Sequence, residues 1–202
     1  MRSLYMLCSF HEELKLLSDA ELLAYFFGSR ALALLKKHKG LYGVFDPDNL
    51  ADQRYRKLFI AREILVRAFR ESLIDRDCCN DPTKVKDYLR LHFAGKQAEA
   101  FVAVWLDAQN RVLAIDELFR GTLTQTSVYP REVAKRALER NAGGVIFSHN
   151  HPSSGATEPS RADCILTAEL KQTLLLIDVK VLDHIVVADG VPPLSFAERG
   201  IL

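Results

Sequence analysis

The chain has 202 residues, of which 49% are hydrophobic and 26% charged, and its 27 basic against 26 acidic residues leave a formal net charge of +1. These values are typical of globular proteins and exclude collagen-like, low-complexity and mostly disordered chains. A chain of this length can bury one large core or two small ones, and its near-zero charge argues against bulk binding to nucleic acid or anionic membranes.

No segment predicts a membrane or secretory role. The longest apolar stretches, such as residues 143–147 and 185–188, fall far short of the roughly 20 residues that a membrane-spanning helix needs. The apolar N-terminus reaches His11, Glu12 and Glu13 too early for a signal peptide, and no small-residue cleavage site follows. The sequence therefore predicts a cytoplasmic protein with no membrane partner.

The first third of the chain has a helical pattern. Apolar residues recur at intervals of three and four over residues 17–71, Ser18 and Asp19 suit a helix start, and Gly28 and Gly40 suit helix ends. A polar, turn-forming stretch, IDRDCCNDP, then interrupts the pattern. We predict a helical domain over residues 1–75, a linker over 76–82 and a second domain over 83–202.

The second domain alternates strands and helices. Pro130 favours a helix start, and the wholly apolar GGVIFS segment favours a central strand. The predicted order is a helix over 83–93, strands over 101–106 and 112–118, a helix over 131–141, a strand over 143–148, a helix over 160–176 and a strand over 179–187. This order predicts an α+β fold with a mixed β-sheet flanked by helices.

Chemically promising residues follow the predicted central strand. Alternation places His149 and His151 on the same side of an extended segment, where two imidazoles can hold one ion. A loop of small residues then returns the chain to Asp163, whose carboxylate would supply a third ligand. Two histidines and one carboxylate leave the fourth tetrahedral position to water, as in catalytic zinc sites.

Simpler interpretations exist for the same residues. Ser160 and Asp163 stand at the S-x-x-D spacing of a helix capping box, and H-x-H pairs occur in unrelated folds. Capping and metal ligation can coexist, since an ordered helix start would help to fix the carboxylate. The chain lacks the deaminase motifs, H-E-x-x-H and both glycine-rich nucleotide motifs, and its second part is too short for an amidohydrolase barrel.

The set His149-x-His151-Pro152, Ser160 and Asp163 resembles the JAMM (MPN+) metalloprotease motif. The surrounding sequence resembles the bacterial RadC family in particular, with some details like its shorter, mobile-element members. The similarity covers roughly residues 97–202, and the matching segments are residues 119–123, 128–133, 149–153, 181–187 and 195–200.

This resemblance implies a JAMM/MPN-like fold, layered like cytidine deaminases, with one Zn²⁺ per chain held by His149, His151 and Asp163. It also implies that Glu99 acts as general base and that Ser160 hydrogen-bonds the developing oxyanion. The family motif usually has seven residues between the second histidine and the serine, whereas this chain has eight. Because loop insertions cost little free energy, we expect Asp163 still to reach the metal.

The implied function is that of a zinc-dependent metallopeptidase or isopeptidase acting on an unidentified protein or peptide. An alternative is a DNA-associated repair or recombination accessory protein with a structural or vestigial zinc site. The N-terminal part resembles a helix-hairpin-helix domain, but residues 51–56 lack the closely spaced glycines that approach a phosphate. We expect His184 to be structural, Asn150 to form a packing or hydrogen-bonding contact near the site, and Trp105 to lie in the core.

Overall fold

The computed structural model describes residues 14–74, 82–121, 128–152 and 155–202. The chain divides into two compact units, Met1–Ile64 and Leu65–Leu202. The predicted linker falls almost entirely outside the described residues, so the predicted boundaries at 75 and 83 stay predictions. Within the described ranges, no helix combines the length and apolar character needed to cross a bilayer.

Short helices make up the first unit, as the periodicity predicts. In chain order they are α2 (Asp19–Phe27), the 3-10 turn η1 (Gly28–Arg30), α3 (Ala31–His38), α4 (Leu41–Val44), the 3-10 turn η2 (Pro47–Ala51) and the start of α5 (Arg56–Leu73). Ser18 caps α2 through a reciprocal pair of hydrogen bonds with Glu21, which satisfies amides that the first helical turn leaves free. Leu23, Val44 and Tyr55 lie at the centre of this unit's core.

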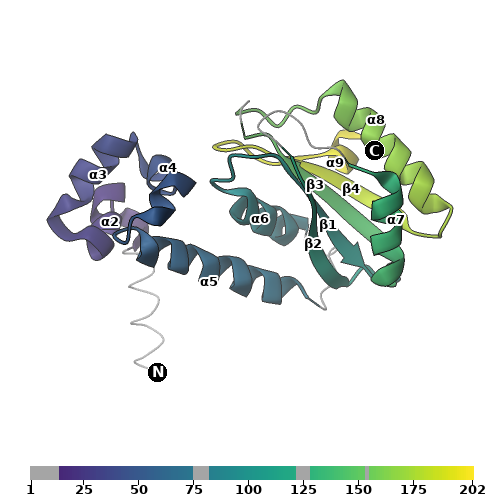
Figure 1. The fold of residues 1–202 in the computed structure, drawn as a ribbon, viewed down its shortest axis with the longest axis horizontal. Helices are drawn as coiled ribbons and strands as arrows, with labels where there is room; N and C mark the ends of the chain where they lie inside the picture. The colour runs from purple at the N-terminus through teal and green to yellow at the C-terminus, as the bar shows by residue number, and fades with distance from the viewer. Residues whose placement is uncertain (1–13, 75–81, 122–127, 153–154) are drawn as a thin grey trace. The chain divides into compact units, whose positions relative to one another are not determined.

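The second unit is built on a mixed five-stranded sheet, which confirms the predicted fold class (Figure 1). Its strands are β1 (Ala100–Leu106), β2 (Val112–Arg120), β3 (Gly144–Asn150), β4 (Lys180–Val187) and β5 (Leu194–Ser195). Their order is β2-β1-β3-β4-β5; β3 and β4 are parallel, and the other neighbours are antiparallel. The short β5 and the following α9 (Phe196–Arg199) are additions to the predicted order.

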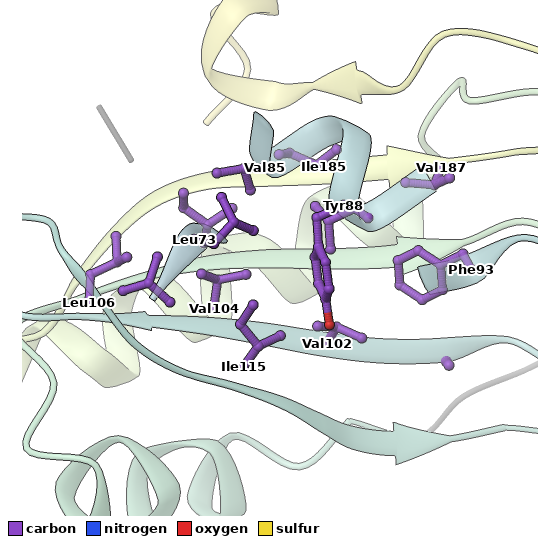
Figure 2. Packing of buried hydrophobic residues seen from close by; sticks show 14 residues of the cluster. Leu73, Val85, Tyr88, Phe93, Val102, Val104, Leu106, Ile115, Ile185 and Val187 are labelled. Atoms are coloured by element: carbon purple, nitrogen blue, oxygen red, sulfur yellow. The ribbon is translucent and has the colours of Figure 1, made fainter. Parts of the chain in front are cut away.

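Helices cover both faces of this sheet. The helix α6 (Pro82–Phe93) lies on one face, whereas α7 (Pro130–Glu139) and α8 (Arg161–Leu175) lie together on the other (Figure 1). All seven residues of β1 are buried, so this strand contributes alternate side chains to both cores. Figure 2 shows the α6 face, where side chains of α6 meet Val102 and Val104 of β1. Trp105 points to the opposite core and is fully buried, as predicted.

The strand β3 extends two residues beyond its predicted end, to Asn150. It therefore includes His149, which pairs with Phe101 of β1 and Val186 of β4. The backbone amide of His151 continues the ladder by donating to the carbonyl of Val187 over 2.8 Å. Both histidines are thus fixed by main-chain pairing at the carboxyl ends of two parallel strands.

We expect Leu89→Ala to destabilise the second unit. Leu89 is fully buried in α6, and truncating a buried leucine costs about 2–5 kcal/mol through lost burial and a residual cavity. Leu176→Ala is the matched control, because Leu176 is 86% exposed and should change the unfolding free energy by less than about 0.5 kcal/mol. Urea unfolding measures both, and equal effects would contradict the assigned core.

Candidate metal centre

Two strand-end histidines and one helix-start carboxylate converge on the α8 side of the sheet. His149 and His151 come from the end of β3, and Asp163 stands in the first turn of α8. One potential ligand atom from each of the three residues lies within 4.8 Å of the others. The structure therefore brings together the three residues that the sequence singles out, despite the longer loop between His151 and Ser160.

The spacing of these atoms fits a small tetrahedral cation. The two histidine Nε2 atoms lie 3.0 Å apart; Asp163 Oδ1 is 3.3 Å from His149 Nε2, and Asp163 Oδ2 is 3.6 Å from His151 Nε2. Zinc–ligand bonds of about 2.0–2.1 Å require neighbouring donor atoms about 3.3 Å apart in a tetrahedron. The three side chains are 9–17% exposed, so the group is shielded but open to solvent.

The second ring nitrogen of His151 is also engaged. Its Nδ1 lies 3.1 Å from the carbonyl oxygen of Ala156, which can only accept, so Nδ1 carries a hydrogen and Nε2 is the nitrogen that can bind either a proton or a metal ion. The hydrogen bond with Asp163 raises the pKa of His151, burial opposes that rise, and the Ala156 carbonyl and the charges of Asp163 and Glu99 add to it. A positive charge at this position is therefore favoured.

Asp163 serves as both a capping residue and a potential ligand. Its Oδ2 accepts hydrogen bonds from the amide and the hydroxyl of Ser160, each over 2.7 Å, and the Ser160 oxygen accepts from the Asp163 amide over 3.1 Å. Burial raises the pKa of Asp163, but the contacts with His149, His151 and Ser160 outweigh it and hold that pKa far below its usual range. The carboxylate is thus anionic, and its Oδ1 is turned toward His149.

His149 contacts a buried pair of polar residues, His184 and Thr167. His149 Nδ1 lies 2.8 Å from Nε2 of His184, which is fully buried on β4. His184 Nδ1 in turn lies 2.6 Å from the hydroxyl of Thr167 on α8. His184 is buried and contacts a candidate ligand directly, and its predicted structural role stays a prediction. Sequence reasoning missed Thr167; its place one helical turn after Asp163 is the signal that could have identified it.

Glu99 immediately precedes β1, and hydrogen bonds hold the backbone on both sides of it. Asn150 Oδ1 accepts from the amide of Ala100 over 2.7 Å, and Asn150 Nδ2 donates to the carbonyl of Ala98 over 3.2 Å. The amide of Gly121 donates to the carbonyl of Glu99 over 2.8 Å. Asn150 thus forms the predicted hydrogen-bonding contact near the site, and it does so on both sides of Glu99.

Register and alternation place Glu99 near the histidines. Phe101 pairs with His149 in the antiparallel register of β1 and β3. Two residues further toward the end of this pairing, Glu99 comes opposite His151, and alternation places it on the same face of the sheet as Phe101. The charge of Glu99 contributes to the raised pKa of His151, in agreement with this placement. The structure brings His149, His151, Ser160 and Asp163 into contact, and strand register places Glu99 beside them. The individual roles of all five residues stay predictions.

Comparison with known proteins identifies close relatives. The model of the RadC-like JAB domain matches residues 79–201. A UPF0758 protein of Nitrosospira multiformis is 50% identical over 203 residues, which cover 92% of this chain and 90% of the relative. Another, of Dechloromonas aromatica, is 48% identical over 204 residues with the same two coverages. A third, of Albidiferax ferrireducens, is 56% identical over 146 residues, covering 72% of this chain and 62% of the relative.

We predict that Ser160→Ala weakens both the helix and the metal site. Losing the cap should cost about 1 kcal/mol of unfolding free energy, and Asp163 loses the contacts that fix its orientation. Ser18→Ala removes the equivalent hydroxyl of a capping box remote from the site. Zinc titration against a chelator should show weaker binding for Ser160→Ala than for wild type or Ser18→Ala. Equal zinc affinity in wild type and both variants would contradict a role of the Ser160 cap in metal binding.

Zinc binding should weaken as the pH falls. A metal must displace any proton from His151 Nε2, and the pKa of this group is raised above its usual value of 6.5, so protons compete already above that pH. Affinity should be greatest above the raised pKa and fall as the pH drops through it. Chelator competition between about pH 8 and pH 6 measures this trend; an affinity that rises or stays constant over that interval would contradict the assigned ligand.

Proposed function

The chain belongs to the family with the RadC-like JAB domain, and from this premise and the donor geometry we propose that it is a zinc-dependent peptidase or isopeptidase. The observation that carries the proposal is the cluster of donor atoms from His149, His151 and Asp163. The two Nε2 atoms lie 3.0 Å apart, and the two carboxylate oxygens of Asp163 lie 3.3 Å from His149 Nε2 and 3.6 Å from His151 Nε2. Two imidazoles and one carboxylate favour zinc, and three protein ligands leave one position for a reactant.

The proposed reaction is hydrolysis of an amide bond. Bound zinc would supply a Lewis acid that lowers the pKa of water toward about 7 and polarises the substrate carbonyl. We assign the general base to Glu99, whose carboxylate would accept a proton from the attacking water and return it to the leaving amine. Water thus adds across the carbon–nitrogen bond, and the products are a carboxylic acid and an amine.

Two neighbours support these assignments. Asn150 holds the backbone on both sides of Glu99 and so fixes the position from which the Glu99 side chain extends. Ser160 holds Asp163 through its hydroxyl hydrogen, which already points at Oδ2. A hydrogen bond from Ser160 to an oxyanion, as the family resemblance implies, therefore requires rotation of that hydroxyl during the reaction.

The alternative of a DNA-associated accessory protein has less support. Among the basic residues of the first unit, Arg54 is bound by Asp52 through its Nε and a terminal guanidinium nitrogen, which reduces its availability for phosphate. Residues 52–55 form turns that lead into α5. No specific contact of the described first unit favours DNA binding.

We predict that Glu99→Gln keeps the metal and loses turnover. The amide preserves the size of the side chain but cannot accept the proton from water, which should lower the rate by about 10²–10⁴-fold. Zinc-loaded protein is incubated with peptides from a digested bacterial lysate, and new amino termini are counted by mass spectrometry. Wild type should generate termini that a chelator abolishes, and Glu99→Gln should retain about one zinc per chain.

Glu132→Gln is the matched control, because Glu132 is a half-exposed carboxylate on α7. It should cleave like wild type. Normal cleavage by Glu99→Gln would exclude the assigned base, and chelator-insensitive cleavage by wild type would exclude the metal from the reaction.

A further inference from the structure

Thr167 and His184 connect two of the candidate ligands through a buried path. The path runs from His149 Nδ1 to His184 Nε2 over 2.8 Å, and from His184 Nδ1 to Thr167 Oγ1 over 2.6 Å. Thr167 Oγ1 also lies 2.6 Å from the backbone carbonyl oxygen of Asp163. His184 and Thr167 are 0% and 3% exposed, so this path is shielded from solvent.

The direction of each hydrogen bond follows from the number of available hydrogens. A hydroxyl has one hydrogen, and the carbonyl of Asp163 can only accept, so Thr167 donates there. Its oxygen must then accept from His184, which places the hydrogen of His184 on Nδ1. The remaining nitrogen of His184 is an acceptor, so His149 donates from Nδ1. His149 Nε2 then has a lone pair, which can face a metal ion or a proton on His151 Nε2, 3.0 Å away.

The surroundings of His184 favour this arrangement. The rings of Phe101, Phe147 and Phe196 lie around it, with centroids 5.6, 6.3 and 4.9 Å from its own. In this apolar enclosure a neutral imidazole is favoured over a charged one. Within the described residues, the His184 ring makes polar contacts with His149 and Thr167, one at each nitrogen.

We propose that Thr167 and His184 are positioning residues that fix the tautomer and orientation of His149, so that His149 Nε2 is prepared to bind the metal. The hydroxyl of Thr167 sets the orientation from α8, the helix that also carries Asp163. The same path therefore fixes the position of Asp163 on α8 relative to His149 on β3. This inference rests on the zinc site of the proposed function and adds two residues to it.

The test compares Thr167→Val with Thr167→Ser in the full chain. Valine keeps the shape of threonine but lacks the hydroxyl, so His184 can reverse its hydrogen and His149 can then carry a hydrogen on Nε2. We expect Thr167→Val to bind zinc about 10- to 100-fold more weakly in chelator competition, the usual effect of losing such a supporting contact. Thr167→Ser keeps the hydroxyl and should bind like wild type.

Ser148→Ala controls for the loss of a buried hydroxyl. Ser148 neighbours His149 on β3 and donates to the carbonyl of Ile185 over 2.7 Å, on the opposite side of the strand. Its loss should lower stability without changing zinc affinity. Equal zinc affinity for Thr167→Val and wild type would overturn the inference, as would an equal loss in Ser148→Ala.

A second measurement reports the tautomers directly. In zinc-free wild type labelled with ¹⁵N in its histidine rings, long-range ¹H–¹⁵N spectra report which nitrogen of His149 and His184 carries hydrogen. We expect a hydrogen on Nδ1 of both rings, and a shift of His149 away from that form in Thr167→Val. A hydrogen on His149 Nε2 in wild type would overturn the inference. Failure of wild type to bind zinc would instead contradict the proposed function, while this spectrum still decides the tautomer.

Discussion

Three groups that can share one cation, two imidazole nitrogens and a carboxylate, converge where β3 ends and α8 begins, and the elements of the second unit hold them there. Nε2 of His151, Nε2 of His149 and the carboxylate of Asp163 lie 3.0–3.6 Å apart. Bringing three such groups together in a partly buried site is unfavourable unless a proton or a metal ion lies between them. The pKa of His151 is raised in keeping with this, chiefly because Asp163 hydrogen-bonds the charged ring.

Each of the three side chains is held by a strand or a helix of the second unit. Main-chain hydrogen bonds fix His149 on β3 and His151 directly after it, and the capping box of α8 fixes Asp163. Side chains alternate along this segment, so His149 and His151 face α8 and Asn150, between them, faces the other way. Asn150 binds the backbone around Glu99. One three-residue segment thus places two candidate ligands and supports the candidate base.

Much of this fold could be predicted from the sequence, because periodicity and turn residues report local structure directly. The sheet's mixed character, the buried Trp105 and the H-x-H, Ser and Asp set all follow from such patterns, and Glu99 required a family resemblance. The path through Thr167 and His184 could not be predicted, since it depends on how α8 packs on β4. The short β5 and α9 were missed because two- and four-residue elements leave too little pattern to detect.

The most direct test of the central claim is a crystal structure of the zinc-soaked full chain with anomalous diffraction measured on both sides of the zinc edge, accompanied by metal analysis. The account predicts one zinc per chain, with His149, His151 and Asp163 each about 2.0–2.2 Å from the ion. A chain that takes up no zinc, or an anomalous peak away from these three side chains, would contradict it.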